Sequence, residues 1–220
     1  MSYEMKKKNI LCYGDSNTWA YDAVHAGRFE YEDRWCGKIL QDALGDDYRV
    51  YEAGFGGRTT VFDDPLWAHA NGFTDFPTAL GTNYPLDLVI IMLGTNDAKI
   101  HLRQEAYSIE KGMERLVREA LTPNAMIPKE NIPKVLVVSP AAIIRDNTIE
   151  APAEDFDERS CRLIAELPAR YEAMAKRNGV EFFDAATVAA PCKYDGVHLD
   201  SESHKKLGLA IAEKVKEMLG

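Results

Sequence analysis

A serine that could act as a nucleophile lies near the start of the chain, at the end of the tripeptide Gly14-Asp15-Ser16. The apolar run before it, residues 10–13, predicts a buried strand, and the glycine predicts a tight turn directly after that strand. A hydroxyl in such a turn is held at the rim of the fold. The free N–H groups of a helix starting over residues 17–21 would face the same place. The tripeptide is equally compatible with a serine that only caps this helix.

A base for this serine is offered by Asp195 and His198, which precede the last predicted helix. A serine hydroxyl is a weak nucleophile unless a base removes its proton. With Gly196 easing the turn, the aspartate can reach one ring nitrogen of the histidine and leave the other free to accept the proton of Ser16. The remaining histidines do not combine an aspartate at this spacing with an intervening glycine. We interpret them as surface or loop residues: His25, His69, His101 and His204.

Groups that could stabilise an oxyanion follow the first three predicted strands. Each of these strands is followed by a polar, glycine-containing turn, and the carboxyl ends of neighbouring strands in a doubly wound sheet face one crevice. The tetrahedral intermediate of acyl transfer needs fixed hydrogen-bond donors at its oxyanion. A glycine lets the backbone approach a ligand closely. The sequence therefore predicts an oxyanion hole formed by the N–H groups of Ser16 and Gly57 and the side-chain amide of Asn96.

The elements that must position these residues are five short apolar runs separated by helical patterns. The nearly continuous hydrophobicity of the third and fourth runs is typical of strands covered on both faces, and so of a parallel sheet. The alternation of strands and helices predicts an α/β fold, a three-layer αβα sandwich with right-handed crossovers. The predicted strands span residues 9–13, 49–52, 86–92, 134–138 and 180–183. Irregular segments, which we expect to be loops around the site, span residues 22–33, 58–77 and 144–155.

Length and composition narrow the class of protein. The 220 residues, 46% of them hydrophobic, fit one domain over residues 1–220. The net charge of −9 argues against a nucleic-acid partner, which needs clustered basic residues. No apolar run approaches the roughly 20 residues that span a bilayer, and nothing before the first predicted strand resembles a signal peptide. The four cysteines are scattered without metal-ligand spacing, so we expect free thiols, no metal and a cytoplasmic protein.

The polar blocks, taken in order, resemble the SGNH (GDSL-type) hydrolase superfamily. They are Gly14-Asp15-Ser16, Gly57, Gly94-x-Asn96-Asp97 and Asp195-x-x-His198. Finer stretches, such as residues 58–60 and 135–140, resemble its bacterial arylesterase and acyltransferase branch. The resemblance implies a flavodoxin-like, five-stranded parallel sheet of order 2-1-3-4-5, and a catalytic serine, aspartate and histidine that need no metal or cofactor. It also implies hydrolysis of short-chain or aryl carboxylic esters through an acyl-enzyme, acyl transfer to alcohols or peroxide, and a homo-oligomer.

Residues beside these blocks are expected to bind the small-molecule ester: Asn17, which stands where the family name expects leucine, Trp19 and Arg58. For Arg58 we favour the alternative of a structural role, and we interpret Asp15 and Asp97 as anchors of their turns. The aromatic residues around the first two turns either form core or line a pocket or a subunit interface. Two other functions stay open: a carbohydrate acetylesterase on the same fold, and a non-catalytic ligand-binding or assembly module. The intact set of site residues argues against the second.

Overall fold

A parallel sheet of five strands forms the centre of the molecule. The computed structural model describes residues 7–122 and 128–220. The strands are β1 (Lys8–Gly14), β4 (Tyr48–Gly54), β5 (Leu88–Met92), β6 (Lys134–Ser139) and β7 (Glu181–Asp184). They lie in the order β4-β1-β5-β6-β7, and every neighbouring pair is parallel. Numbered along the chain within this sheet, the order is 2-1-3-4-5, so the predicted fold class is confirmed.

Side chains of the central strands alternate between two hydrophobic cores, one on each face of the sheet. In β1, Leu11 and Tyr13 enter one core, while Ile10 and Cys12 enter the other. A strand buried on both faces has no position for a polar side chain, which explains its continuous apolar sequence. β4 lies at an edge of the sheet and most of its residues are only half-buried, so its apolar pattern is weaker.

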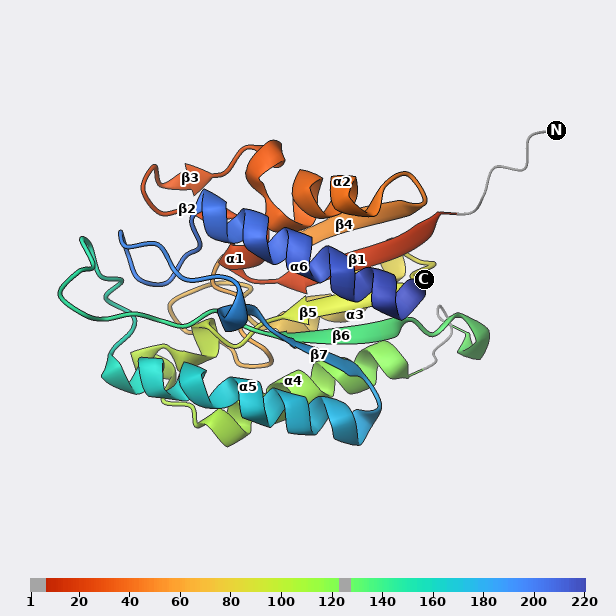
Figure 1. The fold of residues 1–220 in the computed structure, drawn as a ribbon. Coiled ribbons are helices and arrows are strands. Elements are labelled where there is room, and N and C mark those ends of the chain that lie inside the picture. The colour runs from red at the N-terminus through yellow and green to blue at the C-terminus, as the bar shows by residue number, and fades with distance from the viewer. Residues whose placement is uncertain (1–6, 123–127) are drawn as a thin grey trace.

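Helices cover both faces of the sheet (Figure 1). They are α1 (Ser16–Trp19), α2 (Leu40–Leu44), α3 (Gly72–Thr82), α4 (Ala106–Leu121), α5 (Glu158–Asn178) and α6 (Ser201–Leu219). α3, α4 and α5 supply Phe76, Met113 and Leu167 to one core, while α2 and α6 supply Leu40 and Ile211 to the other. The fold is thus a three-layer sandwich. Over residues 7–122 and 128–220, no helix combines the length and the apolar character that a membrane span requires.

The segments predicted to be irregular contain some regular structure. The prediction of a loop over residues 58–77 is wrong for its last part, because α3 begins at Gly72. Asn71 caps this helix by accepting the Phe73 N–H at 3.1 Å. Residues 22–33 include part of a small antiparallel pair, β2 (Tyr21–Asp22) and β3 (Gly27–Arg28). The remaining short elements are a π-helical turn (Trp35–Ile39) and 3-10 turns (Tyr31–Asp33, Asn96–Ala98, Ile100–Leu102, Lys129–Asn131 and Ala185–Thr187).

Candidate active site

The turn after β1 places Ser16 at the first position of α1, a single helical turn. Asp15 is the N-cap of this helix, and its Oδ1 accepts the Asn17 N–H at 2.9 Å. The alternative in which Ser16 itself caps the helix is therefore wrong, and Asp15 anchors the turn as expected. Gly14 is required because a Cβ at this position would lie 2.0 Å from Thr18 Oγ1. The Ser16 side chain is left to line a cavity at the carboxyl edge of the sheet.

His198 joins Ser16 to Asp195. Its Nε2 lies 2.9 Å from Ser16 Oγ, and its Nδ1 lies 2.5 Å from Asp195 Oδ2. Asp195 Oδ1 accepts the Val197 N–H at 2.9 Å, the His198 N–H at 3.0 Å and the Cys192 thiol at 3.4 Å. Burial raises the pKa of Asp195, but the hydrogen bonds from His198 and Val197 outweigh burial and hold this pKa at about 2. The ionised carboxylate therefore keeps a proton on Nδ1 and leaves Nε2 to act on the serine.

Asn17 holds the loop that carries His198. Its Oδ1 accepts the Leu199 N–H at 2.9 Å, and its Nδ2 donates to Val197 O at 3.4 Å. One side chain thus binds both neighbours of the histidine. Asn17 is 4% exposed and does not line the cavity, so the structure does not bring it to the place where a substrate would bind. The reason is its position on α1, one residue after the serine, from which its amide faces the histidine loop.

The three predicted oxyanion donors lie around one cavity. In the part of the chain that the structure describes, neither the Ser16 N–H nor the Gly57 N–H donates to another protein group. Gly57 adopts a left-handed conformation with a φ of 79°, which favours glycine. Asn96 Nδ2 donates to Arg58 O at 3.1 Å, which holds the amide beside the glycine. The arrangement leaves two backbone donors and one amide near the serine hydroxyl.

Arg58 and Asp97 brace the turns that carry these donors. Arg58 Nη1 donates to Gly14 O at 2.8 Å and to Ala53 O at 2.6 Å, so its side chain ties the ends of β1 and β4 together. Arg58 is 6% exposed and does not line the cavity, which gives it the structural role rather than the substrate contact. Asp97 Oδ1 accepts the Thr60 N–H at 3.0 Å and the Thr60 hydroxyl at 2.5 Å. This carboxylate joins the turns after β4 and β5.

The site opens into a cavity of about 550 Å³ with a mainly apolar lining. Of the three residues expected to bind substrate, Trp19 lines this cavity. Tyr21 lies against His198, with 4.6 Å between the centroids of the two rings. Several further lining residues were not assigned to the site from the sequence; they are Phe55, Lys99, Asp155 and Phe156. Asp155 lies in the predicted rim loop over residues 144–155 and Phe55 in the turn after the second predicted strand, whereas no sequence signal marked Lys99 or Phe156.

The other histidines lie away from this cavity. Their interpretation as surface or loop residues is wrong for His204, which is fully buried on α6. Neither of its ring nitrogens has a hydrogen-bond partner within the described ranges. His25 Nδ1 lies 2.7 Å from Asp22 Oδ2, and His101 Nε2 lies 2.8 Å from Asp64 Oδ1. Among residues 7–122 and 128–220, no group of three or more His, Cys, Asp or Glu side chains could hold a metal ion.

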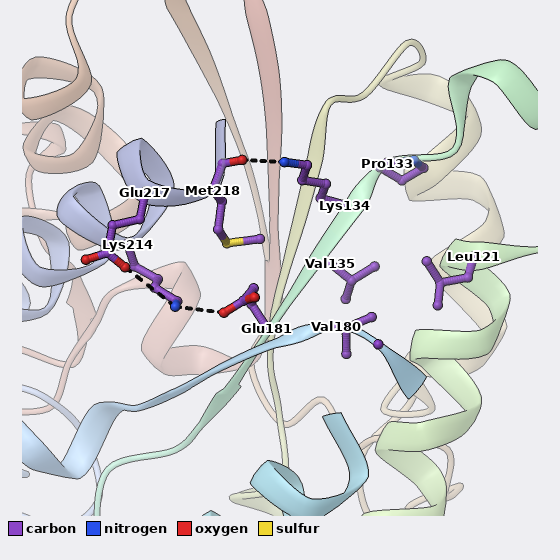
Figure 2. A pocket seen from close by; sticks show the side chains of 10 residues that line it. Leu121, Pro133, Lys134, Val135, Val180, Glu181, Lys214, Glu217 and Met218 are labelled. Carbon is purple, nitrogen blue, oxygen red and sulfur yellow. Dashed lines mark hydrogen bonds and ion pairs between the residues drawn. The ribbon is translucent and has the colours of Figure 1, made fainter. Parts of the chain in front are cut away.

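A second cavity, of about 520 Å³, lies at the amino ends of β6 and β7 (Figure 2). Lys134, at the start of β6, donates to Met218 O. Lys214 lies between Glu181 at 2.7 Å and Glu217 at 3.6 Å. Lys214 and the two glutamates of this cavity are thus paired with one another, whereas Ser16 and His198 line the first cavity, which is therefore the candidate active site. Figure 2 shows the apolar part of the second cavity, formed by Leu121, Val135 and Val180.

Comparison with known proteins places this chain and its fold in one class of enzyme. A model of the GDSL-like lipase/acylhydrolase family matches residues 12–206. The chain therefore belongs to this family, whose solved members with the same fold include SGNH esterases. It is a carboxylic ester hydrolase.

Individual relatives cover the chain to different extents. The aryl esterase of M. smegmatis is 40% identical, with a TM-score of 0.88 over 96% of this chain and 100% of that chain. A carbohydrate acetylesterase from Sinorhizobium meliloti is 39% identical, with a TM-score of 0.87 over 97% and 100%. An acetylxylan esterase from Xylanibacter ruminicola is 22% identical over 94% of this chain, which spans only 43% of that curated relative. The expected homo-oligomer and cytoplasmic location are tested by none of these and stay predictions.

Proposed function

We propose that this enzyme is a serine esterase that cleaves small, uncharged carboxylic esters through an acyl-enzyme on Ser16. The observation that carries the proposal is the chain of contacts from Ser16 Oγ to His198 Nε2 at 2.9 Å and from His198 Nδ1 to Asp195 Oδ2 at 2.5 Å. These contacts lie at an apolar cavity large enough for a small ester. A nucleophile, a base and a carboxylate that orients the base are the groups that acyl transfer requires.

The reaction begins when Ser16 Oγ attacks the ester carbonyl carbon and its proton passes to His198 Nε2. The carbonyl oxygen becomes an oxyanion, which the N–H groups of Ser16 and Gly57 and the Asn96 amide stabilise. When the tetrahedral intermediate collapses, the C–O bond to the alcohol breaks and the alcohol leaves with the proton from Nε2. Asp195 stays ionised throughout and stabilises the imidazolium that forms in between.

The second half of the reaction repeats these steps with water. His198 Nε2 takes a proton from a water molecule, whose oxygen attacks the acyl carbon of the Ser16 ester. Collapse of the second tetrahedral intermediate returns the proton to Ser16 Oγ and releases the carboxylic acid. An alcohol or peroxide that enters the cavity in place of water would accept the acyl group by the same steps, which is the acyl transfer that the sequence resemblance implies.

Aryl and short-chain acetyl esters are the substrates that we favour. The cavity walls include Trp19, Tyr21, Phe55 and Trp67, and aromatic side chains pack well against flat apolar groups. The 40% identity to an aryl esterase supports the same class. The second candidate is a carbohydrate acetylesterase, supported by the 39% identity to an enzyme of that description. Turnover of phenyl acetate against an acetylated sugar, each with and without a competing alcohol, separates these alternatives.

The Ser16→Ala variant tests the proposed function. It should lower kcat by on the order of 10⁵-fold or more while the unfolding transition remains. A fluorophosphonate should label one residue of the wild type, and mass spectrometry should locate the label on Ser16. Ser201→Ala, at an exposed position on α6, is the matched control and should keep full activity and labelling. Turnover that survives in Ser16→Ala, or a label on another residue, would contradict the mechanism.

A further inference from the structure

A buried ammonium group lies in the wall of the cavity, between two carboxylates. The Lys99 side chain is 3% exposed, and its Nζ lies 3.3 Å from Asp64 Oδ2 and 3.7 Å from Asp155 Oδ2. These residues come from the loop after β4, the segment after β5 and the loop before α5. Lys99 and Asp155 both line the cavity, whereas Asp64 does not and its side chain has no exposed surface. The wall thus presents one cation and one anion to a bound ester.

Asp64 balances the charge of Lys99 from behind the wall. Burial raises the pKa of Asp64, but the Leu66 N–H at 2.9 Å, His101 at 2.8 Å and Lys99 outweigh burial and lower it below its usual range. The buried carboxylate is therefore ionised, and Lys99 already has a full counter-charge without Asp155. The Asp155 side chain is 43% exposed. Its charge is the unbalanced one at the cavity surface.

This group of charges lies one aromatic ring away from the oxyanion hole. Lys99 Nζ lies 4.9 Å from the centroid of a Trp67 ring. The same indole lies against Gly57, because a Cβ added to that glycine would meet it at 3.5 Å. An ester whose carbonyl oxygen reaches the Gly57 N–H therefore places its acyl or alcohol part within a few ångströms of these charges, in a cavity with a mainly apolar lining. Over such a distance a charge on the ester interacts appreciably with the wall.

We propose that Lys99 and Asp155 are specificity-determining residues that set which charge this cavity accepts on an ester. The inference rests on the proposed function. The unbalanced carboxylate favours uncharged and cationic esters and disfavours esters that carry a carboxylate. Lys99, although a buried cation at a substrate site, does not serve as an anion receptor, because Asp64 already neutralises it. The net negative charge of the wall depends on three side chains distant in sequence, because Asp64 balances Lys99 and leaves the charge of Asp155 unbalanced.

The two residues should shift selectivity in opposite directions. Asp155→Asn removes the unbalanced negative charge, so kcat/KM for an anionic ester should rise about tenfold relative to a neutral one. Lys99→Met removes the positive charge and keeps most of the side-chain volume, so the same ratio should fall by a similar factor. A mere loosening of the wall would change both ratios in the same direction or leave them unchanged. Added salt should reduce both shifts, since screening weakens charge interactions.

The experiment compares esters that differ in charge at one end. Phenyl acetate, para-acetoxybenzoate and para-acetoxyphenyl trimethylammonium vary the charge on the leaving group. The para-nitrophenyl esters of butyrate, succinate and trimethylammoniobutyrate vary it on the acyl group. Each is assayed at about pH 8, where a free imidazole is neutral, and each kcat/KM is divided by that of the neutral ester on the same variant. Partial loss of folded enzyme then cancels from the ratio.

The proposal is supported if, in either series, Asp155→Asn and Lys99→Met shift the kcat/KM ratio of the anionic ester in opposite directions and that of the cationic ester in the reverse sense. Shifts of the same sign, or ratios within about twofold of wild type in both series, overturn it. Asp155 is partly exposed and should tolerate substitution, so Asp155→Asn alone decides the outcome if Lys99→Met does not fold. Glu154→Gln, at the exposed neighbouring carboxylate, and Lys205→Met, on the exposed face of α6, are the matched controls. The proposed function fails separately, through retained activity of Ser16→Ala on the neutral ester.

Discussion

The chain contains the same local aspartate–histidine pair twice, in two different settings. Residues 21–25 read Tyr-Asp-Ala-Val-His and residues 194–198 read Tyr-Asp-Gly-Val-His. In the first pair, His25 Nδ1 lies 2.7 Å from Asp22 Oδ2, and in the second, His198 Nδ1 lies 2.5 Å from Asp195 Oδ2. In both pairs the other carboxylate oxygen accepts the N–H groups of the valine and of the histidine itself. The same local sequence therefore adopts the same pair in two different surroundings.

The surroundings make only the second pair a candidate for catalysis. The His25 side chain is 79% exposed, whereas that of His198 is 18% exposed. Asn17 binds the backbone on both sides of His198, and Ser16 Oγ lies at its free nitrogen. The imidazole of His25 is instead largely exposed to solvent. The five-residue sequence thus forms an aspartate–histidine pair in both places. The histidine becomes a candidate base only where the tertiary fold adds a nucleophile, a side chain that holds the histidine loop, and a cavity.

Removal of each histidine tests this comparison most strongly. His198→Ala should lower kcat by on the order of 10⁴–10⁶-fold, because the serine then has no base. His25→Ala should leave kcat within about twofold of wild type, since exposed substitutions away from a site have small effects. Steady-state hydrolysis of phenyl acetate measures both. Comparable losses in the two variants would mean that the first pair also serves the reaction.

Removal of each carboxylate charge should give the next largest contrast. Asp195→Asn keeps the shape of the side chain but no longer selects the proton on His198 Nδ1, so kcat should fall by on the order of 10⁴-fold. Asp22→Asn should keep nearly full activity. The pKa of Asp195 is held at about 2, so the wild type should not lose this charge above about pH 3. A fall of less than tenfold in Asp195→Asn would show that the carboxylate does not orient the base.

The one residue that differs between the two copies gives a reciprocal test. Gly196 has a φ of 75°, and a Cβ there would lie 2.1 Å from Ile144 O; Ala23 in the first copy does not adopt a left-handed conformation. Gly196→Ala should therefore lower the free energy of unfolding by about 2 kcal/mol and kcat by on the order of 10²-fold through displacement of His198. Ala23→Gly should change neither by much. Urea unfolding and steady-state kinetics measure the effects, and an active, fully stable Gly196→Ala would disprove them.

The sheet could be predicted from sequence because its central strands are apolar on both faces, so that composition alone marks them. The start of α3 could not. Pro77 indicates a break in a helix, and the segment before it is rich in turn-forming residues. In the structure the Asn71 cap and the burial of Phe76 and Leu80 outweigh that proline. Packing against residues distant in the chain therefore decides the structure of this segment, and the local sequence does not contain that information.

Within the candidate site, residue types and turn positions could be predicted, but side-chain directions could not. Ser16 and His198 follow from the chemistry of their neighbours and from the ends of the strands. Asn17 and Arg58 are adjacent to such residues, yet the first faces the histidine loop and the second the end of β1. Which loop packs over a side chain is a tertiary property that spacing does not contain. The balance of charges around Lys99 could not be predicted from the sequence for the same reason, since its three residues come from separate segments.

A third histidine, His204, extends the comparison because its side chain is fully buried. Its substitution should affect stability rather than rate. Burial of His204 lowers its pKa from 6.5 to about 4. The groups near it are Asp200 on its own helix, the His198 ring and the edge of Phe29. Between these two pKa values the unfolded chain binds the proton and the folded chain does not. Stability contributed by neutral His204 is thus present above about pH 6.5 and is lost as the pH falls toward 4.

His204→Leu should remove this dependence. Leucine fills the buried position without a titratable group, so the variant should lose less stability than the wild type on acidification. The difference in the free energy of unfolding, variant minus wild type, should rise by about 2 kcal/mol when the pH is lowered from 7 to 5. Urea unfolding at the two pH values measures the difference. His25→Ala, which removes an imidazole that is 79% exposed, serves as the control and should leave the pH dependence unchanged. Parallel stability curves for His204→Leu and the wild type would mean that the buried imidazole accepts a proton in place, so that burial alone does not separate the three histidines.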